Sequence, residues 1–204
     1  MSLDGTYTSL KDSIADWIAR DDLTSVIPDF VVQFEAEANL RLRVRDQETV
    51  TTLTTTLGVV ALPSDYLAWR RVYNTTNGTR RELEYVHPSY LTALYPTSAA
   101  GDPKSFTIDA GNLIILPYND TASAITFDYY KVVPPLASNA SNWLLTKWPN
   151  VYLNGSLAEA YKYIKNYDSA LRHTQLRDDL IDKIIQLDAQ SRGPAAIRVM
   201  GHTP

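Results

Sequence analysis

The chain has 204 residues, of which 45% are apolar and 21% charged, with no cysteine and a formal net charge of −4. This composition is typical of one globular domain, or of a core with an inserted subdomain, and it excludes global disorder, disulfides and thiolate chemistry. The acidic balance disfavours a protein that grips the nucleic-acid backbone, and no run approaches the roughly 20 apolar residues of a membrane helix.

Two helices are predicted near the amino terminus. Apolar residues recur at helical spacing from Tyr7 to Ile18, and Thr6 or Thr8 is suited to cap this first helix. The second helix is predicted to begin at Pro28, whose fixed φ fits a first helical position. The predicted apolar stripes are Tyr7, Leu10, Ile14, Trp17 and Ile18 in the first helix and Val31, Phe34, Ala38 and Leu42 in the second.

The character of the sequence changes after residue 47. The run "TVTTLTTTL" from Thr49 is β-branched and alternating, which is typical of an exposed strand. Asn77-Gly78 and Ala110-Gly111-Asn112 each separate two alternating runs, which predicts two hairpins. A further strand is expected in "AITFDYYKVV", and one helical turn in "PSYLTAL". Residues 48–135 are therefore predicted to form a small antiparallel β subdomain.

Helices are expected again after Asn142. Pro149 is predicted to open a helix of about 17 residues, and Asp168 to cap the last helix. The apolar stripe predicted for that last helix is Leu176, Leu180, Ile184 and Leu187. Gly193-Pro194 ends it, and residues 193–204 are expected to form an extended tail.

The expected fold class is therefore α+β. We predict an antiparallel α-helical bundle with an inserted small antiparallel β subdomain and an extended C-terminal tail. The predicted segments are 1–47 (bundle), 48–135 (β insertion), 136–192 (bundle) and 193–204 (tail).

Catalytic and metal sites are not indicated. The three histidines, His87, His173 and His202, have no carboxylate or second histidine at metal-ligand spacing, so no metal or cofactor is predicted. The acidic pairs Glu35 with Glu37 and Asp178 with Asp179 are too close in sequence to share a helix face. "NGSLAEA" lacks the second glycine of a serine-nucleophile elbow, and its small residues favour the close approach of another backbone. We expect no enzyme activity.

The one compact basic cluster is Arg41, Arg43 and Arg45, in "LRLRVR". In an extended segment these side chains share a face, where they meet the phosphates of DNA. In a helix they fan out as a solvated helix end that complements the C-terminal dipole. The helix-end interpretation is favoured, and the DNA-facing interpretation is kept as its alternative.

Five blocks, in order along the chain, together resemble the head–tail adaptor (connector, or head-completion) proteins of tailed bacteriophages. They cover most of residues 10–190, and none of them is catalytic. The blocks are "ADWIARDDLTSVIPDFVVQFEAEANLRLR", "LPSDYLAWRRV", "GDPKSFTIDAGNLIILP", "ITFDYYKVVPPL" and "NWLLTKWPNVYLNGSLAEAYKYIKN".

This resemblance implies a structural virion protein of the neck, assembled in the host cytoplasm. Such adaptors form a ring, typically of twelve copies, beneath the portal protein, where they extend the DNA channel and present a surface for tail or stopper proteins. The expected partners are the portal, tail or stopper proteins, further copies of this chain and, transiently, passing DNA, without a membrane. The alternatives are a small glycan- or nucleic-acid-processing enzyme and a stand-alone nucleic-acid-binding module, which the missing acid/base pairs and the net charge of −4 disfavour.

The aromatic residues around 142–161 are interpreted within this resemblance as packing bulk in a stiff bundle. A sugar-binding platform needs exposed, coplanar rings beside polar groups, whereas these rings are spaced along the start of a helix. Burying each contributes roughly 1.5–3 kcal/mol. The residues assigned to packing are Trp17, Phe34, Trp143, Trp148, Tyr152 and Tyr161.

The tail, residues 193–204, is predicted to bind the portal. Fully extended it reaches about 40 Å. Ile197, Val199 and Met200 supply apolar anchors, and Arg198 supplies a fork for a carboxylate. We expect docking on the portal by addition of a strand to one of its sheets. The alternative is that the tail folds back on its own bundle.

Overall fold

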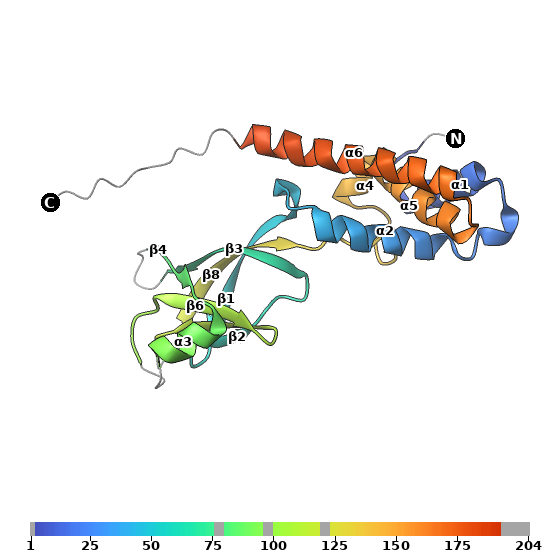
Figure 1. The fold of residues 1–204 in the computed structure, drawn as a ribbon. Helices are drawn as coiled ribbons and strands as arrows, with labels where there is room; N and C mark the ends of the chain where they lie inside the picture. Colours follow the sequence, from blue (N-terminus) through green and yellow to red (C-terminus); the bar gives the residue numbers. More distant parts are fainter. Residues whose placement is uncertain (1–2, 76–79, 96–99, 119–122, 193–204) are drawn as a thin grey trace. The chain divides into compact units, whose positions relative to one another are not determined.

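A computed structural model describes residues 3–75, 80–95, 100–118 and 123–192 (Figure 1). Helix accounts for 47% and strand for 26% of the residues that the structure describes, so the protein is mixed α and β. The chain divides into two compact units, which we call the helical unit (residues 1–46 and 133–204) and the β unit (residues 47–132). The turn predicted at Asn77-Gly78 and the tail predicted at 193–204 lie outside the described residues.

The described helical unit is built from five α-helices. The two amino-terminal helices begin near the predicted positions: Thr6 caps the first through a hydrogen bond from the N–H of Ser9, and Pro28 lies in the first turn of the second. Ala19, in the left-handed region with φ 52°, ends the first helix. The helices are α1 (Tyr7–Ile18), α2 (Ile27–Arg41), α4 (Trp143–Lys147), α5 (Pro149–Tyr163) and α6 (Tyr167–Ser191), with 3-10 turns at Asp21–Leu23 and Arg45–Gln47.

Helix α5 is the centre of the helical unit, packed against α1, α2, α4 and α6. Most of its length is buried, because small residues alternate with large apolar ones. Its buried residues are Val151, Tyr152, Leu153, Gly155, Ser156, Leu157, Ala158 and Ala160. The core that surrounds them includes Leu10, Ile14, Phe34, Leu42, Leu144 and Ile181.

One predicted helix cap is wrong. Asn166, not Asp168, caps α6, because its side chain accepts the N–H of Ser169, and Asp168 lies inside the first turn. Helix α5 begins at Pro149 as predicted and has 15 residues, close to the predicted length of about 17. Upstream of it Asn142 caps the separate short helix α4 by accepting the N–H of Leu145.

Two predicted apolar stripes also need correction. Trp17 is 56% exposed, so it lies outside the buried face of α1. On α6, Leu176 and Leu187 are 45% and 49% exposed, and only Ile184 of the predicted stripe is buried. The buried face of α6 is instead formed by Ala170, His173, Arg177, Ile181 and Ile184. It includes two polar residues that hydrophobic periodicity does not select.

The β unit contains two four-stranded sheets, ordered β1-β8-β3-β4 and β2-β7-β6-β5. Pairing is antiparallel except between β5 and β6, which are parallel. The elements are β1 (Glu48–Thr55), β2 (Val59–Ala61), β3 (Tyr66–Asn74), β4 (Arg81–Glu82), β5 (Glu84–Tyr85), α3 (Pro88–Leu94), β6 (Ser105–Asp109), β7 (Asn112–Leu116) and β8 (Ser123–Lys131).

The predicted hairpin at Ala110-Gly111 is confirmed. Both residues have positive φ, 46° and 76°, between the paired strands β6 and β7. Such a turn matches the twist of the strands it joins. The apolar residues of both sheets meet in one core, which comprises Val72, Leu83, Phe106, Leu113, Ile115, Ile125, Phe127 and Tyr129.

Candidate assembly surfaces

A buried hydrogen-bonded joint connects the segment before α4 to helices α2 and α5. It consists of Glu35, Leu136, Asn142 and Tyr152. Asn142 donates to the Tyr152 hydroxyl at 2.6 Å, and that hydroxyl donates to Glu35 Oε1 at 3.1 Å. The N–H of Leu136 donates to the same carboxylate oxygen at 2.8 Å. Burial raises the pKa of Glu35, although both hydrogen bonds oppose the rise, and burial with the nearby Glu35 charge raises the pKa of Tyr152.

The aromatic residues predicted to pack lie at different depths. Phe34 and Tyr152 are fully buried, with their rings edge to face at a centroid distance of 4.9 Å. Trp143, Trp148 and Tyr161 are partly buried against the same core. Trp148 ends α4 and immediately precedes α5. These rings therefore lie against the helical core.

The ring of the buried His173 packs against two aromatic side chains of the helical unit. Its ring stacks on Tyr161 at 5.2 Å, and Trp17 approaches it edge-on at 5.7 Å. Its Nδ1 lies 2.9 Å from Asn154 Oδ1. Burial and then Arg172 lower the pKa of His173, which favours the neutral ring. This packing role explains why a histidine occupies the buried face of α6.

The predicted basic cluster is held by acidic and backbone groups of the helical unit. Arg41, the last residue of α2, contacts Asp178 at 2.5 Å and Asp182 at 2.9 Å on α6. Arg43 donates to the carbonyl oxygens of Asn39 and Leu42, at 2.7 and 2.5 Å. Only Arg41 lies in the helix, so the favoured helix-end interpretation describes one of the three arginines.

Arg45 makes a second connection to α6. Its Nε and its backbone N–H both donate to Asp188 Oδ1, at 3.2 and 3.1 Å, and its guanidinium also contacts Ser191. We call the contacts of Arg41 and Arg45 with α6 the arginine clamp. Partial burial works to raise the pKa of Asp178 and of Asp188. Hydrogen bonds and charge from Arg177 and Arg41 outweigh burial and lower the pKa of Asp178 below its usual value. Hydrogen bonds from Arg45 and Arg192, with the charge of Arg192, do the same for the pKa of Asp188.

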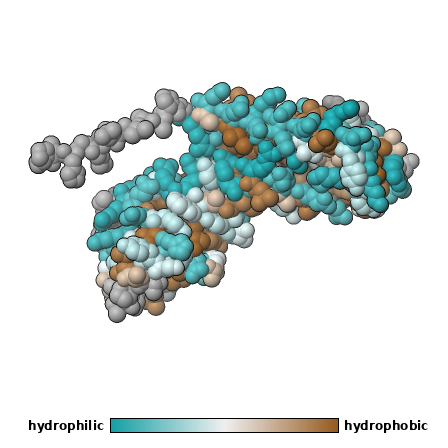
Figure 2. All heavy atoms as spheres, in the orientation of Figure 1, coloured by the Kyte–Doolittle hydropathy of each residue, from teal (hydrophilic) through white to brown (hydrophobic). Residues whose placement is uncertain are grey.

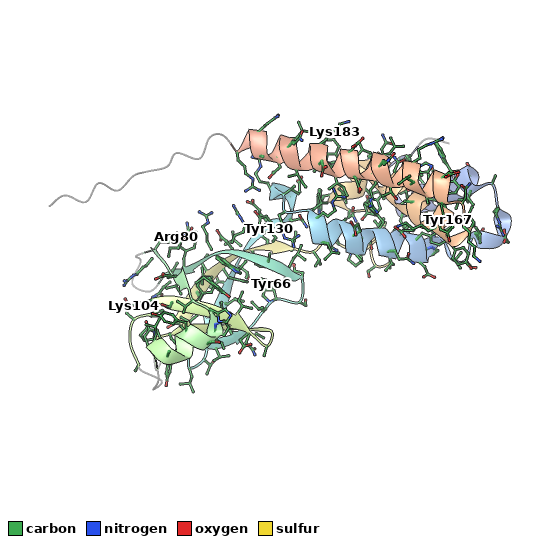
Figure 3. The ribbon with its side chains drawn as sticks, in the orientation of Figure 1. Tyr66, Arg80, Lys104, Tyr130, Tyr167 and Lys183 are labelled. Atoms are coloured by element: carbon green, nitrogen blue, oxygen red, sulfur yellow. The ribbon has the colours of Figure 1, made fainter. Side chains whose placement is uncertain are left out.

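Helix α6 also carries exposed apolar side chains. Figure 2 shows brown patches that interrupt the hydrophilic surface along this helix. The residues are Tyr167, Leu171, Leu176, Ile185 and Leu187, each more than a third exposed. Lys183, labelled in Figure 3, is exposed on the same helix. Tyr167, Leu171 and Ile185 lie on one flank of the helix and Leu176 and Leu187 on the other, with the buried face between them, and exposed apolar side chains of this kind are suited to contact other proteins.

The β unit carries arginine side chains on its surface and also contains a cavity. Arg80, labelled in Figure 3, lies over the Tyr73 ring at 4.0 Å, and Arg71 pairs with the buried Asp128 at 3.2 Å. A cavity of about 440 Å³ lies beside α3, β6 and β7, and the buried Thr107 is among its lining residues. Among the described residues, the Thr107 hydroxyl has no hydrogen-bond partner.

Within the described part of the chain, no three His, Asp or Glu side chains gather as metal ligands. No described helix combines the length and the apolar character needed to cross a membrane. The joint, the aromatic packing and the arginine clamp are hydrogen bonds, ion pairs and apolar contacts within the chain that stabilise the helical unit.

The sequence profile of the SU10 adaptor protein family matches residues 5–199. The chain belongs to the SU10 adaptor protein family. No curated protein matches the sequence. The protein is thus a phage adaptor, a structural component of the virion that interacts with other capsid or tail components. Its resemblance to phage head–tail adaptors, first seen in five sequence blocks, agrees with this membership.

The carboxylates of the arginine clamp were missed by sequence reasoning, which considered Asp178 only as a pair with Asp179. A signal existed in the spacing. Asp178 and Asp182 are four residues apart on α6, so both lie on one face of this helix, and both contact Arg41. The predicted tail residues Ile197, Arg198, Val199 and Met200 lie outside the described residues.

Proposed function

We propose that this adaptor forms a ring between the portal and the tail, extends the DNA channel and provides the surface to which tail or stopper proteins attach. Membership of the SU10 adaptor protein family over residues 5–199 is the observation that carries the proposal. Twelve copies are expected, in the neck of the virion. Each copy contacts two neighbours through a head-to-tail interface, because a closed ring requires two different complementary surfaces.

In this proposal the helical unit acts as an antiparallel bundle, and the β unit is a subdomain inserted into it. A ring closes only if each copy keeps a fixed angle to the next. The buried joint at Glu35 and Tyr152 and the arginine clamp on α6 both support the required stiffness, because each connects chain segments more than 100 residues apart.

DNA passes the ring by transient, non-specific contact. Arg41, Arg43 and Arg45 remain the candidate channel-facing residues. Their hydrogen bonds to carboxylates and carbonyl oxygens within the chain support a wall that does not hold the passing phosphates. Binding several phosphates through free cations creates a strong affinity at low salt, which a sliding contact has to avoid.

The decisive experiment is co-assembly with the portal protein from the same genome. The two purified proteins are mixed, separated by size and imaged by electron microscopy. We expect a ring of adaptor on one end of the portal ring. A chain that stays monomeric beside intact portal rings, while its circular dichroism and thermal melting show that it is folded, contradicts the proposal. An unrelated phage portal is the matched control.

A further inference from the structure

Strand β1 presents a long, unprotected sheet edge. It lies at the end of its sheet, and its eight residues pair with β8 in one unbroken register, from Glu48 opposite Tyr130 to Thr55 opposite Ser123. The edge strands β2, β4 and β5 have only three, two and two residues. Among the strands the structure describes, β1 is therefore the longest edge strand, and β2 meets the chain just beyond its C-terminal end, where Thr56 bridges to Val59.

This edge lacks the features that usually prevent strand addition. Sheet edges are normally protected by lysine, proline, a bulge or short length. Residues 49–55, "TVTTLTT", contain neither charge nor proline, and the register with β8 has no bulge. Val50, in the same stretch, is 63% exposed. An edge with this composition is suited to accept a strand from another polypeptide.

We infer that β1 accepts residues 195–200 of a neighbouring copy as an added strand. The inference rests on the ring proposed above. The segment "AAIRVM" contains no acidic residue or proline and follows Gly193-Pro194 in the sequence. Its six residues match most of the seven-residue edge 49–55, and the full tail spans about 40 Å when extended.

The two faces of the segment match the two faces of the sheet. On β1, Thr51 and Leu53 lie opposite Phe127 and Ile125 of the core, whereas Val50, Thr52 and Thr54 are exposed on the other face. In an added strand, Ile197 and Val199 share one face, and Arg198 and Met200 share the other. Placing Ile197 and Val199 beside Leu53 extends the apolar layer and leaves Arg198 in solvent.

The absence of cysteine allows a direct test by disulfide formation. Chains with Val50→Cys, Thr52→Cys or Thr54→Cys are each mixed with differently tagged chains carrying Arg198→Cys, assembled on portal rings and oxidised. Residues directly opposite in neighbouring strands bring their Cβ atoms about 4.5–5.5 Å apart, near the spacing of a disulfide. We expect a cross-linked pair of differently tagged chains with at least one of the three positions, each of which is exposed.

Two controls give the test its specificity. Thr8→Cys, an exposed threonine of α1, should not cross-link to Arg198→Cys. Ile197→Cys should cross-link to the exposed-face cysteines far less than Arg198→Cys does, because adjacent residues of a strand point to opposite faces. Synthetic peptide 193–204 added in excess should reduce the cross-link, and the same peptide with Ile197→Pro and Val199→Pro should not.

Three results would overturn the inference while leaving the ring intact. These are portal-bound rings without any cross-link from β1, cross-links that appear only when both cysteines are placed in a single chain and never between differently tagged chains, and cross-links from Arg198→Cys to portal cysteines instead. The last outcome would show that the tail binds the portal, as predicted from the sequence. Failure of the wild-type chain to assemble on portal counts against the proposed ring itself.

Discussion

At Gly155 the central helix has no room for a side chain. A Cβ atom there would lie 2.0 Å from Cδ2 of the fully buried Phe34 ring. We expect Gly155→Ala to lower the free energy of unfolding by about 3 kcal/mol, because a confined ring cannot move away without strain. Thermal melting followed by circular dichroism measures the loss. The double variant Gly155→Ala with Phe34→Leu should recover part of it relative to the sum of the single changes.

Substitution of the next residue, Ser156, should have the opposite effect on stability and serves as the matched control. Ser156 is fully buried, and among the described residues its hydroxyl has no hydrogen-bond partner. Ser156→Ala removes that unsatisfied group and introduces a better helix former, so stability should rise by about 1 kcal/mol. A clear loss of melting temperature would show that the hydroxyl is bound.

Glu35 gives the joint a pH dependence. Its raised pKa means that the folded chain binds this proton more tightly than the unfolded chain, whose value is near 4.5. The contribution of Glu35 to stability is therefore greatest below pH 4.5 and declines as the pH rises through the raised value. Glu35→Gln, which keeps an oxygen for Leu136 and Tyr152, should melt higher than the wild type at pH 7, and the difference should vanish near pH 4.

Individual residues were predictable where their chemistry acts locally. Thr6 was recognisable as a cap, because a hydroxyl before a helix binds a free N–H whatever surrounds it. Gly155 was recognised as a site of close approach, although it faces a ring rather than another backbone. The burial of His173 and Arg177 was not predictable, because their partners Tyr161, Asn154 and Glu159 come from the folded arrangement.

Among the elements, α6 depends on the arginine clamp for part of its attachment to the end of α2. Arg41→Gln should lower stability by about 1 kcal/mol or less, because the pair is partly exposed, and the effect should shrink in high salt. Arg20→Gln is the control, since among the residues the structure describes Arg20 forms its ion pair with Asp22, two residues away, in an exposed turn. Urea unfolding at low and high salt measures both.

Acid weakens the same attachment. The lowered pKa values of Asp178 and Asp188 mean that their contribution is complete above about pH 3.8 and is lost as the pH falls through the lowered values. This direction is opposite to that of Glu35. Hydrogen exchange of the α6 amides should therefore accelerate in the Arg41→Gln variant at pH 6 but differ little from the wild type at pH 2.

The positions of helices and strands were more predictable from the sequence than the faces that they bury. The β6–β7 hairpin followed from Ala110-Gly111, and the Thr-rich run was recognised as an exposed strand. The buried face predicted for α6 wrongly included Leu176 and Leu187. Hydrophobic periodicity counts only apolar residues, whereas this helix also buries polar residues against α5. The parallel pairing of β5 with β6 has no local signal, since it depends on a connection through α3.

At the scale of the molecule, the β unit should fold by itself. It has its own apolar core, and its two ends lie together, with Gln47 Nε2 donating to the carbonyl of Lys131 at 3.4 Å. A fragment of residues 47–132 should show strand-type circular dichroism and melt cooperatively. Residues 1–46 alone should not, because the helices α1 and α2 lack the partner α5. A fragment 47–132 without a cooperative transition would contradict the division into units.

The division of the helical unit into two stretches of chain has a consequence during synthesis. Helices α1 and α2 leave the ribosome first, but α5, against which they pack, follows only after the β unit has been made. At 5–20 residues per second, the roughly 100 intervening residues take on the order of 5–20 s. For that time the apolar faces around Leu10 and Phe34 have no permanent cover, and a nascent chain in this state is a substrate for chaperones.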